Sequence, residues 1–284
     1  MKKFIISIFI LTLATCGGIV LGKTLSESRR ADASVTAQNK PAVTSESFAW
    51  GAFSNPYAFN GPDGKYNSEN IDAQVAYWQD LGLNSLKFNY EFNVDEPFVV
   101  QKENDYLADK LAANNIDGYM VIEYFLKDKD FFAKADFDRG YAWGKFIAEH
   151  FKSRVKYYQM LNEVSGTAIK KDFPGNQESD YDEAKYQAVK NFLLGMSKGI
   201  KEADPEAQRV ITAHWVGTAM IDRLIKDGVD FEIIGWDWFS DMGNDITAAK
   251  PNDKTVINIP EHFKNTGKRF WISEINRQGG SYKN

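Results

Sequence analysis

The chain has 284 residues, of which 43% are hydrophobic, and a formal net charge of −5 at pH 7. This charge argues against nucleic acid as the main partner, because nucleic-acid-binding proteins usually present a basic stripe. The length suits one large core or two small ones, and a single α/β barrel of roughly 250 residues falls within that range. Cys16 is the only cysteine, so the chain cannot form an internal disulfide and core packing must stabilise it.

The N-terminal sequence is typical of an export signal. Lys2 and Lys3 precede a nearly unbroken apolar stretch over residues 4–20, which is typical of a secretory signal rather than of a folded domain. We therefore predict a signal peptide or lipoprotein signal over 1–22. Residues 23–45 are rich in Ser, Thr, Ala and charge without an apolar period, which predicts a linker.

Three processing routes fit this N-terminal segment. Cys16 follows Leu13-Ala14-Thr15, an order that resembles a bacterial lipoprotein signal and predicts a membrane tether through the lipidated cysteine. The alternatives are an uncleaved anchor running to Leu21 and signal cleavage after Ala31-Asp32-Ala33. All three predict a domain outside the cytoplasm, either secreted or attached to the surface of a bacterium.

From residue 46 to 284 we predict one domain in which strands and helices alternate, an order typical of a parallel sheet with helices outside it. The apolar runs predict seven strands, at 48–53, 85–90, 118–125, 155–162, 209–216, 231–239 and 269–274. Amphipathic stretches predict helices from Ser68 to Leu81-Gly82 and at 103–114, 139–152, 181–203, 218–227 and 256–265.

Polar residues gather at the C-terminal ends of these strands. They are Asn89-Tyr90-Glu91, Glu123-Tyr124, Asn162-Glu163, His214-Trp215, Asp237-Trp238 and Ser273-Glu274. In a parallel barrel these ends open onto one face, where barrel active sites lie. The sequence therefore predicts an α/β fold of the TIM type with its functional groups at one mouth.

Two glutamates end strands that would face each other across this mouth. Glu163 ends the fourth predicted strand and Glu274 ends the seventh. Glycoside hydrolysis needs one carboxylic acid that protonates the leaving oxygen and one carboxylate that attacks the sugar carbon or activates water. The competing interpretation is that each glutamate forms a structural ion pair with a basic residue at a strand end.

With these features the chain resembles the retaining glycoside hydrolases of the (β/α)8-barrel clan A, which includes cellulase-, mannanase-, xylosidase- and endo-galactanase-like families. The clan's marks are an Asn-Glu pair ending strand four and a Glu ending strand seven, matched here by Asn162-Glu163 and Glu274. The resemblance spans about residues 48–278. It implies that Glu163 is the acid/base, that Glu274 is the nucleophile and that Asn162 binds the sugar 2-hydroxyl.

Further substrate-binding residues are predicted around this pair. His214 would orient Glu163 or bind a sugar hydroxyl, and one of Trp215, Trp236 and Trp238 would stack on a sugar ring. The remaining predicted substrate-binding residues are Trp50 and Asn89. Each has a structural interpretation as well, since a lone histidine is commonly a satisfied structural residue and tryptophans commonly pack between strands and helices.

The chain departs from the clan pattern at two positions near the predicted nucleophile. Lys87 stands on the second strand, where the clan often has an arginine, and lacks the planar guanidinium fork. Trp238-Phe239 stand on the sixth strand, where the clan usually has a tyrosine. Glu123 is a third strand-end carboxylate, and we expect it to bind hydroxyls or to be paired.

The resemblance implies eight βα units, whereas only seven strands are predicted before Asn284. We therefore expect a barrel that is incomplete at its C-terminal side, and we interpret the chain as a fragment of a longer protein.

The resulting hypothesis is a monomeric retaining glycosidase that acts on β-linked poly- or oligosaccharide without a metal or organic cofactor. One alternative is a non-catalytic carbohydrate-binding surface lipoprotein with a degenerate barrel. The other is a different barrel enzyme, such as a lyase or a hydrolase with a metal at Glu123, His214 and Asp237.

Overall fold

The chain divides into two compact units, Met1–Ala49 and Trp50–Asn284. The computed structural model describes residues 51–54, 68–92, 98, 101–124, 131–243 and 245–276, all of which belong to the second unit. The predicted signal, the linker and Cys16 lie outside the described residues. None of the helices in the described part is long and apolar enough to cross a membrane.

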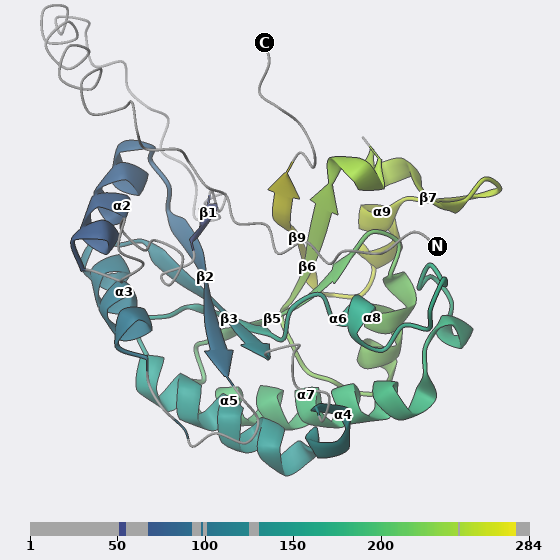
Figure 1. Cartoon of the computed structure of the whole chain (residues 1–284), viewed down its shortest axis with the longest axis horizontal. Helices are drawn as coiled ribbons and strands as arrows, with labels where there is room; N and C mark the ends of the chain where they lie inside the picture. The colour runs from purple at the N-terminus through teal and green to yellow at the C-terminus, as the bar shows by residue number, and fades with distance from the viewer. Residues whose placement is uncertain are drawn as a thin grey trace, which may run out of the picture. The chain divides into compact units, whose positions relative to one another are not determined.

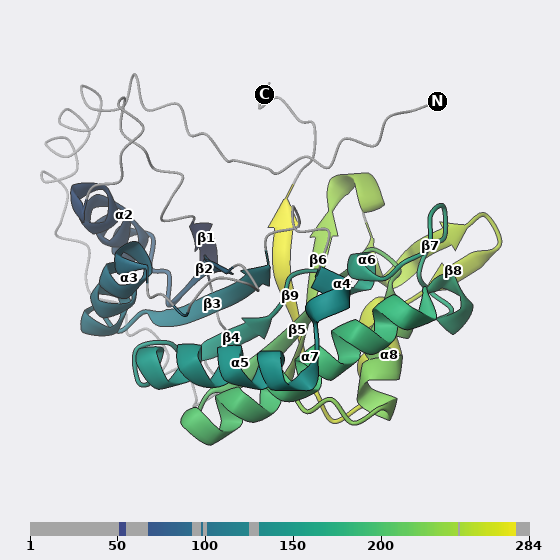
Figure 2. The ribbon, with the colours of Figure 1, turned by 60° about the horizontal axis from the view of Figure 1, so that its bottom comes forward.

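A curled sheet of seven parallel strands forms the centre of the second unit (Figure 1). Its strand order is β1-β2-β3-β4-β5-β6-β9, so neighbours in the sheet follow one another along the chain. The strands are β1 (Gly51–Ser54), β2 (Ser85–Phe92), β3 (Asp117–Tyr124), β4 (Tyr157–Met160), β5 (Gln208–His214), β6 (Ile233–Phe239) and β9 (Arg269–Asn276). All seven overlap the predicted strands. The edge strands β1 and β9 stand on either side of the opening of the curl (Figure 2).

Helices cover the outside of the sheet. They are α2 (Ser68–Asp80), α3 (Lys102–Ala113), α4 (Phe131–Lys134), α5 (Phe137–Phe151), α6 (Val164–Thr167), α7 (Glu183–Ala203), α8 (Thr218–Lys226) and α9 (Ile259–Phe263). Three short 3-10 turns complete the described helical segments, at Glu178–Asp180, Ser240–Met242 and Ile246–Ala248.

Side-chain alternation along the strands produces two separate cores. Residues of one parity, such as Met120 and Ile122 of β3, pack with the helices into the larger core. Residues of the other parity, such as Tyr119 and Val121, join a smaller cluster with Val210 inside the curl. Because successive strand residues point to opposite faces, this division identifies which polar side chains enter the barrel interior.

One predicted helix is wrong in its first half. The segment predicted as a helix over 256–265 begins instead with β8 (Thr255–Ile257), which pairs antiparallel with β7 (Ala249–Asn252). The β-branched residues of β8 favour a strand. Helix α9 begins only after Asn258, whose side chain accepts a hydrogen bond from the backbone N–H of Glu261 at 3.0 Å.

Helices α5 and α7 lie side by side in both views (Figures 1 and 2) and approach so closely that their contact requires glycine. Gly140 and Gly144 of α5 face Gly195 and Gly199 of α7. A Cβ atom added at Gly195 would lie 1.9 Å from the carbonyl oxygen of Phe137. This contact therefore depends on the absence of side chains at the four glycines.

We expect Gly195→Ala to destabilise the domain by about 1–3 kcal/mol in urea unfolding, because overpacked contacts cost about that much. Alanine has a higher helix propensity than glycine by about 1 kcal/mol, which acts in the opposite direction but does not offset the cost of overpacking. Asn191→Ala, on the exposed face of the same helix, is the control. Equal unfolding free energies for the two variants would contradict the close approach.

Candidate active site

Glu163 lies directly after β4 in a segment with unusual backbone conformation. Leu161 has φ 64° and Glu163 has φ 42°, both in the left-handed region that non-glycine residues rarely occupy. The backbone N–H of Glu163 donates to Thr212 Oγ1 of β5 at 2.9 Å. Such strained residues cluster at functional sites, where the surrounding structure holds them in place.

A buried amide holds the end of β4. Gln159 is fully buried, and its Nε2 donates to Thr212 Oγ1 at 2.9 Å and to Asn162 Oδ1 at 2.7 Å. Its Oε1 accepts a hydrogen bond from the Tyr119 hydroxyl of β3 at 2.8 Å. This network joins three neighbouring strands and supports both Asn162 and Glu163. Sequence reasoning missed Gln159 and Thr212, although a polar residue inside a buried strand was the available signal.

Glu274 lies across the barrel, within β9, and forms an ion pair with β2. The ammonium of Lys87 donates to Glu274 Oε1 at 2.6 Å. The side chain of Lys87 is only 5% exposed, whereas that of Glu274 is 27% exposed, so the pair has a buried cation and a carboxylate open toward solvent. The negative charges of Asp237 and Glu274 raise the pKa of Lys87 despite its burial. Lys87 therefore supplies a fixed positive charge to Glu274.

A third acidic group, Asp237 of β6, lies behind this pair. It is fully buried, and its Oδ1 accepts a hydrogen bond from Ser273 Oγ at 2.6 Å. Burial raises the pKa of Asp237 well above its ordinary range, and the charges of Glu274 and Glu163 act the same way, while Lys87 opposes the shift. Both predicted catalytic glutamates are thus close enough to act on one buried carboxyl group.

His214 ends β5 beside Glu163. Its Nδ1 lies 3.8 Å from Glu163 Oε2 and 3.2 Å from Ser165 Oγ, and its ring is 29% exposed. The contact with Ser165 also fits the structural interpretation of a satisfied histidine. His214 is positioned to contact either Glu163 or a bound ligand.

The three tryptophans considered as sugar platforms differ in exposure. Trp236 is fully buried and stacks on Phe270, and Trp238 is 6% exposed with its indole N–H bonded to the Gly243 carbonyl at 2.9 Å. Both rings belong to the larger core between sheet and helices. Little of the Trp238 ring is therefore accessible for the predicted contact with a sugar. Trp215 is half-buried, so part of its ring is accessible for stacking on a sugar.

Asn89 and Glu123 form a pair on neighbouring strands near the same end of the sheet. The Asn89 side-chain amide donates to Glu123 Oε2 at 2.8 Å. The expectation that Glu123 is paired is confirmed by this contact. Trp50, also predicted to bind substrate, lies outside the described residues.

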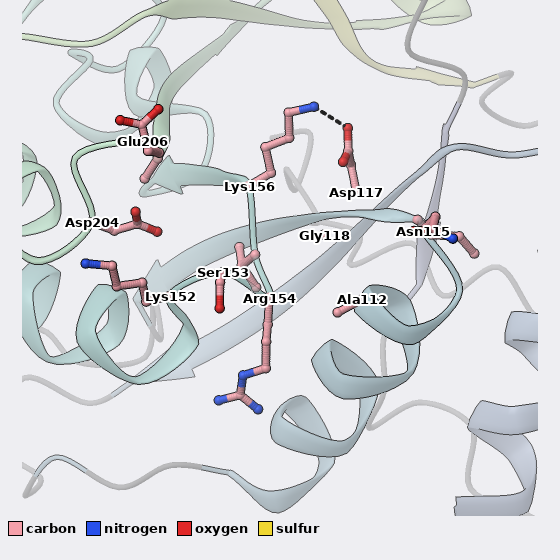
Figure 3. Close-up of a pocket in the computed structure, with 13 residues that line it drawn as sticks. Ala112, Asn115, Asp117, Gly118, Lys152, Ser153, Arg154, Lys156, Asp204 and Glu206 are labelled. Atoms are coloured by element: carbon pink, nitrogen blue, oxygen red, sulfur yellow. Dashed lines mark hydrogen bonds and ion pairs between the residues drawn. The ribbon is translucent and has the colours of Figure 1, made fainter.

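A hollow of about 500 Å³ lies at the opposite end of the sheet and is lined by the residues that precede β3, β4 and β5 (Figure 3). Its basic groups already have partners: Lys156 pairs with Asp117 at 2.7 Å, and Arg154 points away toward Asp105 and Asp109. In barrels this end serves stability rather than chemistry. The candidate site is therefore the mouth that contains Glu163 and Glu274.

The described part of the chain contains no cluster of three His, Cys, Asp or Glu side chains arranged to hold a metal ion. In particular, Glu123, His214 and Asp237 do not form such a cluster. Glu123 is bonded to Asn89, and Asp237 is bonded to Ser273.

No protein-family model matches the chain, and no curated protein matches its sequence. Solved structures do match its fold. The family 1 β-glucosidase from Thermotoga maritima superposes with a TM-score of 0.53 at 14% identity, over 80% of this chain and 77% of that one. A GH10 endoxylanase retrieved from a sugarcane soil metagenome gives a TM-score of 0.55 at 14% identity, over 84% of this chain and 70% of that one.

The fold is that of a (β/α)8 barrel, as in these two structures, with seven strands among the described residues. A calcium-binding mutant of Bacteroides uniformis β-glucuronidase 2 agrees, with a TM-score of 0.55 at 12% identity over 80% of this chain and 25% of that one. The predicted resemblance to the clan A barrels is thereby confirmed for the fold. Because the identities are 12–14%, these matches carry no information on individual residues.

Proposed function

We propose that the chain is a retaining glycosidase that hydrolyses β-glycosidic bonds of a poly- or oligosaccharide by double displacement. Glu274 is the nucleophile and Glu163 is the general acid/base. The observation that carries this proposal is geometric: Glu163 follows β4 and Glu274 lies in β9, and both are at the C-terminal end of the parallel sheet. The Lys87 ammonium lies 2.6 Å from Glu274 Oε1, and His214 Nδ1 lies 3.8 Å from Glu163 Oε2. Neighbours of the same fold named β-glucosidase and endoxylanase support the substrate class.

In the first step, a Glu274 oxygen attacks the anomeric carbon and the glycosidic C–O bond breaks. The proton on Glu163 passes to the leaving oxygen, so the leaving sugar departs as a neutral alcohol. Lys87 stabilises Glu274 as the ionised form that this attack requires, because its ammonium lies 2.6 Å from Oε1. The product of the step is a glycosyl ester on Glu274.

In the second step, water attacks the anomeric carbon of the ester. Glu163, now ionised, accepts a proton from this water, and Glu274 leaves as a carboxylate. The backbone of Glu163 is held by Thr212, which keeps the carboxyl in place for both transfers. His214, 3.8 Å from Glu163 Oε2, is positioned to influence the same proton.

The proposal includes a location outside the cytoplasm. Its support is the apolar segment over residues 4–20 and the position of Cys16 within it. Recovery of the protein in the membrane fraction, with release when Cys16→Ser is introduced, would distinguish a lipid tether from a cleaved signal.

The test of the reaction is hydrolysis of a panel of aryl β-glycosides and β-linked polysaccharides. We expect turnover of at least one substrate, with the β anomer formed first when the reaction is followed by proton NMR. A double displacement retains configuration because each of the two attacks inverts it. Initial formation of the α anomer would exclude the mechanism, and binding of sugar without turnover would favour the carbohydrate-binding alternative.

A further inference from the structure

The strand that carries Glu274 contains an extra residue. Trp236 of β6 pairs with Ile272 of β9, but the next residue, Asp237, pairs with Glu274. Ser273 is therefore inserted without a partner, and the register shift marks a β-bulge. Bulges redirect side chains, and they are over-represented next to active sites.

The bulge explains why Glu274 points into the barrel. Trp271 packs on Tyr157 inside the curl, with ring centroids 4.9 Å apart, so Ser273 shares its inner face. Strict alternation would turn Glu274 to the outer face, where Phe270 stacks on Trp236. Glu274 instead reaches Lys87 across the barrel.

Two neighbours on β6 hold the inserted residue in place. The Ser273 hydroxyl donates to Asp237 Oδ1 at 2.6 Å. Gly235 leaves the room that this hydroxyl occupies, since a Cβ atom there would lie 2.7 Å from Ser273 Oγ and 2.7 Å from Thr212 Cγ2. The strand opposite the bulge is therefore shaped to accept Ser273 inside the barrel.

Asp237 acts here as a hydrogen-bond acceptor rather than as an open charge. Asp237 is fully buried, and its second oxygen, Oδ2, has no hydrogen-bond partner. A carboxylate oxygen in that situation is costly, because it has lost water and gained nothing in exchange. An amide oxygen could accept the Ser273 bond equally well.

From this geometry we infer that Asp237 and Ser273 are positioning residues, whose hydrogen bond holds the β9 bulge and thereby aims Glu274 at the sugar. The inference rests on the proposed function. Asp237 contacts neither substrate nor reacting atoms in this role and acts through Ser273. The charge that assists Glu274 comes from Lys87.

The test compares Ser273→Ala, Asp237→Ala and Asp237→Asn on the best aryl glycoside. A misplacement of about 1 Å can cost about 100-fold in rate, so we expect Ser273→Ala and Asp237→Ala to lose about 10–100-fold in kcat, with KM changed by less than about threefold. Asp237→Asn, which keeps the acceptor, should remain within about fivefold of the parent. A 2-deoxy-2-fluoro glycoside should trap Glu274 as a covalent ester, which mass spectrometry detects as an increase in protein mass. In each variant the rate of this trapping should fall in parallel with kcat.

Ser197→Ala is the control for the loss of a serine hydroxyl, because the Ser197 hydroxyl also donates one hydrogen bond, to the Asp230 carbonyl outside the site. A Ser273→Ala kcat equal to that of Ser197→Ala would overturn the inference. So would an Asp237→Asn loss as large as that of Asp237→Ala, since charge would then be what matters. Should Asp237→Ala fail to fold, the Ser273→Ala comparison still decides. An inactive parent chain would instead contradict the proposed function.

Discussion

Glu274→Ala is expected to lower kcat/KM on an activated aryl β-glycoside by about 10⁴-fold or more, because no other group can form the glycosyl ester. Added azide should restore part of the rate by attacking the anomeric carbon in the space that the side chain vacates. The azide product should have the α configuration, since a single displacement inverts the carbon. The test measures the reaction rate with and without azide and determines the configuration of the product by proton NMR.

Glu232→Ala is the matched control for this experiment. The Glu232 side chain is 26% exposed and pairs with buried Arg209, which resembles the pairing of Glu274 with Lys87, but it lies at the other end of the sheet. Assayed below its unfolding temperature, this variant should keep most of the activity and should not respond to azide. Full activity of Glu274→Ala, or equal losses in the two variants, would contradict the role of Glu274.

Lys87→Met is expected to lower kcat/KM by about 10²–10³-fold, which is the usual cost of removing one preorganised electrostatic group. The loss should be present throughout the neutral range, because the raised pKa of Lys87 keeps its ammonium charged there in the parent. Lys87→Arg should retain more activity than Lys87→Met, because it keeps a charge at that position. Profiles of kcat/KM against pH for the three proteins provide the test.

The pH range of this effect follows from the raised pKa of Lys87. A lysine whose pKa is raised by folding contributes stability that is complete below its ordinary titration and is lost only as pH rises through the raised value. The Lys87 ammonium is therefore charged throughout the neutral range. Equal kcat/KM for the parent and Lys87→Met across the neutral range would show that Lys87 does not act on Glu274.

Much of the fold was predictable because each buried strand corresponds to a short apolar run in the sequence. The run over 118–125, for example, matches β3 (Asp117–Tyr124) within one residue at each end. The failure at 256–265 has a local cause. Thr255–Ile257 form a strand only because β7 offers a partner 3 to 8 residues earlier along the chain, and pairing of this kind overrides helix patterning.

The candidate site was predictable in its residues and less so in its contacts. Strand-end position was enough to select Glu163, Glu274 and His214, because the ends of parallel strands meet at one face. It could not show that Trp238 is only 6% exposed, because alternation places a side chain on a face without saying how deeply that face is covered. Gln159 and Thr212 were missed for a related reason, since their value lies in the hydrogen bonds that they make to neighbouring strands.

By itself the sequence determined the order of strands and helices and the ends at which polar groups collect, because both depend on local periodicity. Only the tertiary structure decided that Glu274 faces the barrel interior and meets Lys87, 187 residues away in the chain. That outcome depends on one unpaired residue, Ser273, in the ladder between β6 and β9. A bulge is a property of two paired strands, so no pattern within β9 alone could reveal it.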